Sequence, residues 1–229
     1  MRYLFFILIF SNTIFAAEPK GVQVQGSCQV KVVPDRGTVS FSTETQSKNQ
    51  QEAVKKSNSQ MNDLKERIQK LKLADLEIKT TNYNVYPVRE YEKDRYVDRG
   101  TKVNMTLEVT TSEIPRLGEA MLEASKAGIQ TVGTLVTFLS LEKSQAEYLK
   151  CLDIASHDAR KKAEQLAKKL GFTVGDVQNV IESPQTTQPT SPQRVMLNKG
   201  AMMESTPDVS IDAGSQNFST NIQVTFDIK

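Results

Sequence analysis

Alternating apolar and polar residues predict strands in the first part of the mature chain. Valines at alternate positions in Val22–Val32, interrupted by Gly26, predict a strand with a kink at the glycine. Residues 34–37 (Pro-Asp-Arg-Gly) predict a turn, because proline presets φ and glycine tolerates positive φ. Val39 and Phe41 then continue as a second strand. We expect these two strands to form a hairpin.

Apolar residues at steps of three and four predict a first helix after these strands. Asn49 can cap this helix, and Glu52 follows three residues later, as in a capping box. One stripe runs along it: Val54, Ser57, Met61, Leu64, Ile68 and Leu71. The stripe could also be a coiled-coil seam, but about three heptads is marginal for one and Ser57 weakens it. We therefore expect the helix to pack on a sheet.

Two further helices are predicted later in the chain. Ser112 can cap the first, which faces Leu117 and Met121 inward and ends at Gly128. The second is long, from about residue 144 to residue 170, and Gly171 stops it. Its expected buried stripe is rich in small residues, which allow close approach to a neighbour: Leu152, Ala155, Ala159, Ala163, Leu166 and Leu170.

The remaining strands differ in how clearly the pattern marks them. A change of parity near residues 80–82 predicts a bulge in a third strand, and residues 89–99, crowded with both charges, read as a solvated hairpin tip. Residues 103–109 alternate clearly. Residues 129–139 are apolar or threonine-rich on both faces, which predicts a strand buried on both sides. A short strand near residues 177–181 and an alternating one at 218–228 complete the set.

The order of these elements predicts an α+β fold. From the second strand onward it is β-α-β-β-α-β, the ferredoxin-like pattern, followed by a long helix and a C-terminal strand pair. We expect mainly antiparallel sheets packed by about three helices. Residues 18–229 are predicted to be a single domain, with a loop rich in Pro, Ser, Thr and Gln at about 183–216.

The first 17 residues have the features of a secretory signal peptide. Arg2 precedes an unbroken apolar run at residues 4–10, and the small residues Ala16 and Ala17 follow. The run is too short for a membrane-spanning helix, which needs about 20 apolar residues, although an uncleaved anchor is the alternative. We expect cleavage after Ala17, no transmembrane helix in the mature chain, and a periplasmic or secreted, envelope-associated location.

The charge balance does not favour nucleic acid as a partner. Lys and Arg total 29 and Asp and Glu total 27, so removal of Arg2 leaves 28 against 27. A protein that neutralises phosphates needs a basic excess on one face. Here both signs are interspersed along the helices, as on a solvated surface.

Few residues are suited to catalysis or metal binding. The two cysteines, Cys28 and Cys151, could form one disulfide in an oxidising compartment or remain as two separate half-buried thiols. His157, the one histidine, faces away from the apolar stripe of its helix. Four carboxylates at the hairpin tip alternate with basic residues that would repel a cation: Glu90, Glu92, Asp94 and Asp98. We predict no catalytic residue, no cofactor and no metal.

Apolar residues also occur inside the proline-rich loop, where they have no core of their own. They are Val195, Met196, Leu197, Met202 and Met203. One hypothesis is that they contact a neighbouring protomer in a homo-oligomer, since thioethers make adaptable contacts. The alternative is a disordered surface loop.

Several short motifs together resemble the SIMPL-domain family of exported bacterial proteins. They are Gly26, the turn Pro34-Asp35, Tyr86-Pro87, the helix run at residues 158–167 (DARKKAEQLA) closed by Gly171, and the strand at 222–228. The resemblance implies a periplasmic or envelope protein. Some members are strong antigens, some are linked to oxidative stress defence, and at least one resembles a ring-like, channel-shaped oligomer. The resemblance to this family implies no catalytic residues.

These observations favour a non-enzymatic envelope protein, either a self-assembling scaffold or a stress-protective binding module. One alternative is a redox or other periplasmic enzyme that uses the cysteines or methionines. Another is a secreted antigen or effector that binds a host protein. The first interpretation is favoured because catalysis requires converging reactive groups, and this chain offers few.

Overall fold

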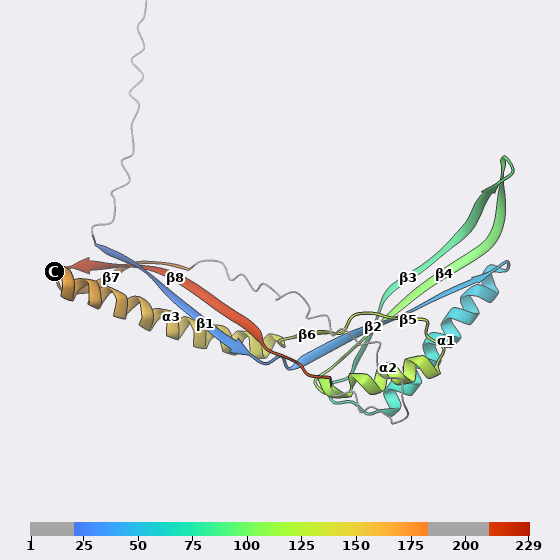
Figure 1. The fold of residues 1–229 in the computed structure, drawn as a ribbon, viewed down its shortest axis with the longest axis horizontal. Helices are drawn as coiled ribbons and strands as arrows, with labels where there is room; N and C mark the ends of the chain where they lie inside the picture. The colour runs from blue at the N-terminus through green and yellow to red at the C-terminus, as the bar shows by residue number, and fades with distance from the viewer. Residues whose placement is uncertain (1–20, 183–210) are drawn as a thin grey trace, which may run out of the picture. The chain divides into compact units, whose positions relative to one another are not determined.

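A computed structural model describes residues 21–182 and 211–229 of the chain. Contacts between residues divide this part into two compact units. Unit 1 contains residues 21–28, 152–182 and 220–229, and unit 2 contains residues 29–151 and 211–219. That residues 18–229 form a single domain stays a prediction. The elements of each unit are labelled in Figure 1.

Unit 1 is built on a three-stranded sheet in the order β1-β8-β7. The strands are β1 (Val22–Val32), β8 (Gln216–Ile228) and β7 (Val174–Glu182), and β7 pairs antiparallel with β8. The C-terminal part of helix α3 (Leu141–Leu170) packs on β1. Alternate side chains of β8 are buried, including Ile222, Val224 and Phe226, as the sequence pattern predicted.

The buried face of α3 differs in part from the predicted stripe. Leu166 is 41% exposed and Leu170 is 72% exposed, so both predictions are wrong, and Ala167 is buried instead. The buried residues step by four along the helix, Ala155, Ala159, Ala163 and Ala167. Small side chains line the contact because the helix lies very close to its neighbouring strand, which leaves no room for leucine.

Unit 2 contains the ferredoxin-like segment. Its sheet has the order β3-β4-β2-β5, so that β4 lies between β2 and β3 and pairs antiparallel with both. A short strand, β6, also pairs with β2. The bounds are β2 (Arg36–Ser47), β3 (Glu77–Glu92), β4 (Arg95–Thr111), β5 (Thr131–Val132) and β6 (Val136–Phe138). The predicted α+β class with antiparallel sheets is confirmed.

Helix α1 (Gln50–Lys70) covers one face of this sheet, over β2 and β4. The Asn49 side chain caps it by accepting hydrogen bonds from the backbone N–H groups of Gln51 (2.9 Å) and Glu52 (3.4 Å), as predicted. Ser57 lies buried against β2, where its hydroxyl is 3.4 Å from that of Thr43. The polar residue in the stripe therefore has a partner in the sheet, and the coiled-coil alternative is not what the structure shows.

A 3₁₀ turn (Ile114–Arg116) precedes helix α2 (Leu117–Lys126). Ser112 does not cap α2, contrary to the prediction, because its hydroxyl donates to the Ala74 carbonyl at 3.4 Å. The predicted end of this helix is confirmed: Gly128 follows it with a φ of +73°, a conformation that glycine adopts without strain.

Strands β3 and β4 confirm two expectations from the sequence. Their register shifts between Thr80 and Asn82, where the change of parity predicted a bulge. The charged residues form the tip of the β3–β4 hairpin, where the Tyr91 and Tyr96 rings meet edge to face with centroids 5.2 Å apart.

Two predicted strand arrangements are wrong. The strands at 22–32 and 36–47 do not form a hairpin, because β1 pairs with β8 and β2 with β4, β5 and β6. Residues 129–139 are not a doubly buried strand but contain β5 and β6 at the edge of the sheet, with Val132 41% and Phe138 38% exposed. Local apolar pattern identified both segments as extended but not their partners, which are set by contacts distant in sequence.

The predicted turn at residues 34–37 contributes a side chain that fixes the start of α3. Asp35 accepts two hydrogen bonds from Ser140, one from its backbone N–H at 2.7 Å and one from its hydroxyl at 2.6 Å. The Ser140 hydroxyl in turn accepts from the Lys143 N–H at 3.2 Å, as an N-cap does. Burial alone would raise the pKa of Asp35, but the bonds from Ser140 outweigh it and hold that pKa below its usual value.

Replacing Asp35 with asparagine should destabilise the protein by about 1 kcal/mol at neutral pH, because a charge-assisted hydrogen bond to Ser140 is lost. A lowered pKa in the folded state means that this contribution is complete above about pH 4 and is lost as the pH falls through the lowered pKa. Denaturant unfolding of the wild type and Asp35→Asn across this range measures both effects.

The matched control is Glu142→Gln, which removes one carboxylate from an exposed position in the first turn of α3. It should change the stability by less than about 0.5 kcal/mol at every pH. An Asp35→Asn variant that loses no more stability than this control at neutral pH would show that Asp35 does not fix the start of the helix.

Candidate functional site

In unit 1, Gly26 of β1 lies directly against helix α3. A Cβ atom built on Gly26 would lie 2.0 Å from the Ala155 carbonyl oxygen and 2.9 Å from the Ala159 Cβ. No side chain fits in that space, so glycine is required for close approach rather than for the kink that the sequence suggested. This contact explains the alanine stripe of α3.

Two side chains of α3 bind the outer edge of β1 beside this contact. Asp158 accepts a hydrogen bond from the Ser27 N–H at 2.9 Å, and Lys162 donates to the Gln25 carbonyl at 2.9 Å. Asp158 and Lys162 also bind each other at 2.6 Å. The hydrogen bond from Lys162, followed by that from the Ser27 backbone, lowers the pKa of Asp158. Both residues belong to the helix run from which the family resemblance was drawn.

A third residue of the same run, Arg160, contacts the opposite part of the sheet. Its guanidinium carbon lies 5.3 Å from the centroid of the Phe226 ring on β8, a cation–π geometry. It also bonds the Glu164 carboxylate at 3.0 Å and the Gly175 carbonyl at 3.4 Å. Three charged residues of the run are therefore engaged in holding strands against the helix.

An open groove of about 220 Å³ lies between α3 and strands β7 and β8. Its floor is apolar, formed by Ile222, Val224 and Phe226, and the side chains of Val177 and Val180 line it from β7. Ser156 and Arg160 supply its polar atoms. The Ser156 hydroxyl already donates to the Leu152 carbonyl at 2.8 Å. The groove is suited to apolar contacts and lacks a pair of groups that could transfer a proton.

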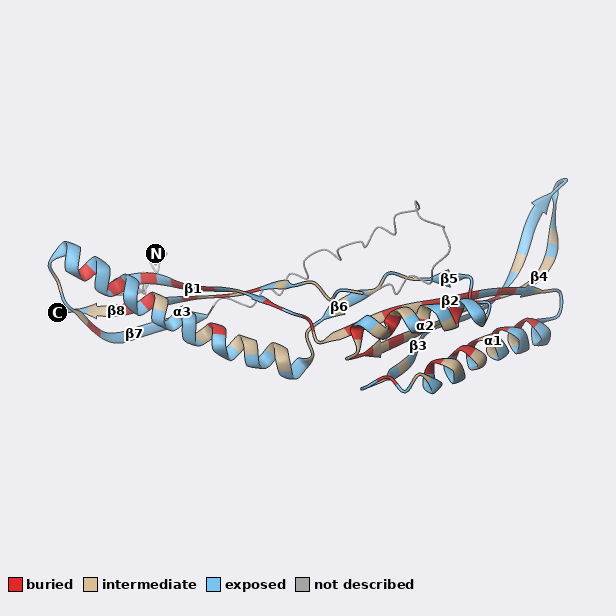
Figure 2. Cartoon of the chain, turned by 60° about the horizontal axis from the view of Figure 1, so that its bottom comes forward, coloured by how far each residue is buried: buried red, intermediate tan, exposed pale blue. Residues whose placement is uncertain are grey.

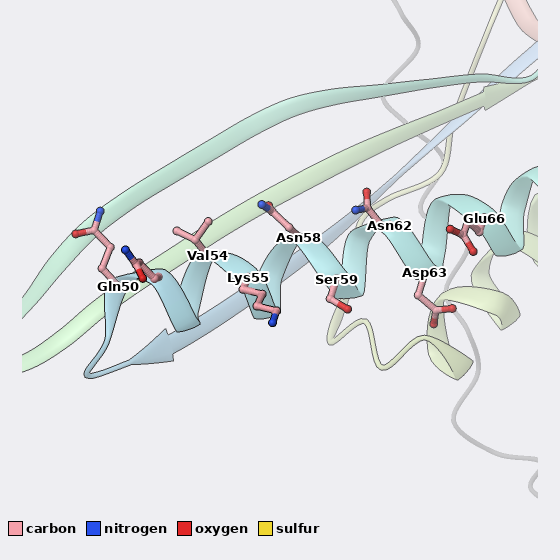
Figure 3. A pocket seen from close by; sticks show the side chains of 9 residues that line it. Gln50, Val54, Lys55, Asn58, Ser59, Asn62, Asp63 and Glu66 are labelled. Carbon is pink, nitrogen blue, oxygen red and sulfur yellow. The ribbon is translucent and has the colours of Figure 1, made fainter.

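A larger hollow in unit 2 runs along α1, as Figure 3 shows. All of its lining residues belong to this one helix, in neighbouring rows at steps of four that include Val54, Asn58 and Asn62. No second element faces them across the hollow among its lining residues. It is the solvated outer side of α1 and does not bring reactive groups together.

The residues considered for chemistry in the sequence do not form a site in the described part of the chain. His157 is exposed, and its nearest charged partner is the exposed Asp153 at 3.5 Å. Cys28 and Cys151 are both buried and disulfide-bonded, so the alternative of two separate thiols is not what the structure shows.

The carboxylates of the β3–β4 tip are bound by neighbouring groups. Arg99 pairs with both Glu90 and Glu92, and Asp98 accepts from the Gly100 N–H at 2.7 Å. Within residues 21–182 and 211–229, no three His, Cys, Asp or Glu side chains cluster as metal ligands do. Val195, Met196, Leu197, Met202 and Met203 lie outside the described residues, so their role as oligomer contacts stays a prediction.

The sequence did not identify the groove. Val177 and Val180 are three residues apart, which is not the spacing of one strand face. They reach the same face because the register between β7 and β8 shifts between Val177 and Asn179. An odd spacing of valines in a short strand was the signal available, and it does not show where a bulge lies.

Comparisons with known proteins agree with the resemblance seen in the sequence. The pattern of the SIMPL family, described as a protein of unknown function (DUF541), matches residues 22–226. The 26 kDa periplasmic immunogenic protein of Brucella melitensis is 25% identical over 96% of this chain and 92% of its own length. The uncharacterized protein YggE of Escherichia coli K12 is 23% identical over 91% of this chain and 83% of its own length.

Across the described residues, none of the helices combines the length and the apolar character that crossing a membrane requires.

The Gly26 contact predicts the effect of the smallest possible side chain. Gly26→Ala should lower the free energy of unfolding by at least about 1–3 kcal/mol, because the added methyl group overlaps the Ala155 carbonyl and α3 has to move away from β1. Gln23→Ala changes an exposed residue of the same strand and should have little effect. Equal stability of the two variants in denaturant would contradict the close contact.

Proposed function

Because the chain belongs to the SIMPL family, we propose that it is an exported, non-enzymatic protein of the bacterial cell envelope that acts as a self-assembling scaffold or a stress-protective binding module. The signal-like residues 1–17 support export. The name of the Brucella melitensis relative, a periplasmic immunogenic protein, supports the periplasm as the location.

The observation that carries this proposal is the engagement of the charged residues in the helix run. Asp158 and Lys162 bind the backbone of β1, and Arg160 binds Phe226, Glu164 and Gly175. These contacts are all within the protein, with its own strands and with α3 itself, and this supports a structural role for the motif.

Self-assembly has support from exposed apolar side chains in unit 1. Three side chains of β7 are about half exposed: Val177 (53%), Val180 (54%) and Ile181 (50%). Apolar surface of this kind, gathered on one strand, marks interaction sites in soluble proteins. It supports a protein that works by contact with other molecules.

The redox alternative requires a cysteine sulfur that another thiol can attack. Cys28 is 3% exposed and Cys151 is 0% exposed, and both are in the disulfide-bonded state. Disulfide exchange depends on access to the sulfur atoms. The burial of both residues supports a structural disulfide.

Three measurements on the purified mature protein test the proposal. Light scattering should give a particle mass that is a multiple of the chain mass. A thiol reagent should label no cysteine in the native protein, and both after unfolding in reductant, because the disulfide is buried. A panel of ester, peptide, phosphate and disulfide substrates should show no turnover.

Two results would count against the proposal. Labelling of native protein within minutes, together with disulfide turnover, would favour the redox alternative. A particle that is monomeric at all concentrations would rule out a self-assembling scaffold. The binding module would then remain as the proposed function.

A further inference from the structure

The last turns of α3 expose two leucines that the sequence pattern placed in the core. Leu166 is 41% exposed and Leu170 is 72% exposed, while Ala163 and Ala167 beside them are buried. In Figure 2, the end of α3 and the turn that follows it have the colour of exposed residues. A Cβ atom built on Gly171, in this turn, would meet no atom within 4 Å. The two leucines therefore lie at an open end of unit 1.

Lysines accompany these leucines. Residues 161–170 contain four lysines and one carboxylate, Glu164, which binds Arg160 at 3.0 Å. In the described part of the chain, no ion pair engages Lys168 or Lys169. Positive charge at a helix C-terminus is favourable in itself. That accounts for the lysines but leaves the exposure of the leucines unexplained.

The chain enters unit 1 at the same end. Ser27 of β1 binds Asp158 of α3. Gln25, two residues earlier in β1, binds Lys162, four residues later in α3. Strand and helix are therefore antiparallel, and the ratio agrees with rises of about 3.3 Å and 1.5 Å per residue. At this ratio Gly21 comes level with the last residues of α3, and Figure 1 shows the start of β1 at that end of the unit.

The segment joined to Gly21 is itself suited to a membrane. Residues 1–20 include the apolar run at residues 4–10 that has the features of a signal peptide. A segment of this kind enters a membrane during export. The end of unit 1 with the exposed leucines and unpaired lysines is therefore the end joined to the segment that enters the membrane.

A phospholipid surface fits the chemistry of this end. A bilayer with anionic lipid presents negative headgroups above apolar acyl chains, which suit Lys168 and Lys169 in the first layer and leucines in the second. Leu166 and Leu170 are four residues apart, so the helix presents both on one side. A nucleic acid would use the lysines but not the leucines.

We propose that the C-terminal end of α3 is a membrane-contact surface, which holds unit 1 on a bilayer of anionic phospholipid through the charges of Lys168 and Lys169 and the insertion of Leu166 and Leu170 among the headgroups. The proposal rests on the export that the proposed function includes, and it names a partner for the exported protein. So few side chains give weak, reversible binding, as a single acyl chain does.

Co-sedimentation of the full mature protein with vesicles at low salt tests the proposal. One set of vesicles is phosphatidylcholine alone, and the other contains about 30% of the anionic lipid phosphatidylglycerol. The wild type should bind the anionic vesicles at least about tenfold more strongly than the neutral ones, and added salt should weaken this binding.

The charges are tested with the double variant Lys168→Gln/Lys169→Gln, which should bind the anionic vesicles about tenfold more weakly or less tightly still. Its matched control, Lys55→Gln/Lys56→Gln, removes the same charge from exposed positions of α1. The control should change the binding by less than about twofold, because screening confines the attraction to charges near the lipid.

The apolar contact is tested with Leu170→Ser, which should weaken binding by about threefold or more. Leu149→Ser is the matched control, because Leu149 is 64% exposed on the same helix but far from its end. The control should change the binding by less than about twofold. All of the replaced side chains are exposed, so the fold should be retained, which thermal unfolding checks.

Four outcomes would overturn the proposal: no binding of the wild type to anionic vesicles, equal binding to neutral ones, equal effects of a variant and its control, or absence of vesicle binding with a particle mass that falls in Leu170→Ser. The last would identify a second copy of the chain as what covers the leucines. Thiol labelling, substrate turnover and the particle mass of the wild type do not depend on vesicles, so failure here is distinguishable from failure of the proposed function.

Discussion

Unit 1 depends on the absence of a side chain at Gly26. Because nothing lies between this residue and the Ala155 carbonyl, α3 approaches β1 closely enough for Asp158 and Lys162 to reach its backbone. A helix displaced by the width of a methyl group would lengthen both hydrogen bonds, which weaken as the distance grows. Gly26, the alanine stripe of α3 and the pair Asp158 and Lys162 therefore act together to hold α3 against β1, although Gly26 lies far from the others in the sequence.

The close packing of α3 on β1 also bears on the distribution of polar and apolar side chains in unit 1. Asp158 and Lys162 of α3 bind the edge of β1, and Arg160 contacts Phe226 of β8, so these three side chains are occupied by contacts within unit 1. On β7, the side chains of Val177, Val180 and Ile181 are about half exposed. Cys28 and Cys151 are buried and disulfide-bonded, as residues of a structural disulfide are.

The sequence predicted elements better than their partners. The Asn49 cap, the bulge at residues 80–82 and the charged hairpin tip depend on local pattern, and all three are confirmed. The pairing of β1 with β8 and the division of residues 129–139 into two edge strands depend on distant contacts, and both were missed. For the site, the helix run and Gly26 were identified but their roles were not, because the contact between them exists only in the folded chain. The groove depends on a bulge in β7 that the sequence does not mark.

The central claim is that the charged residues of α3 hold β1, and amide hydrogen exchange at Ser27 tests it most directly. This amide belongs to an edge strand and donates to Asp158 instead of a neighbouring strand. It should be protected in the native protein and should lose that protection in Asp158→Ala, while amides in the central strand β8 keep theirs. Rapid exchange at Ser27 in the native protein, or protection that survives in the variant, would contradict the account.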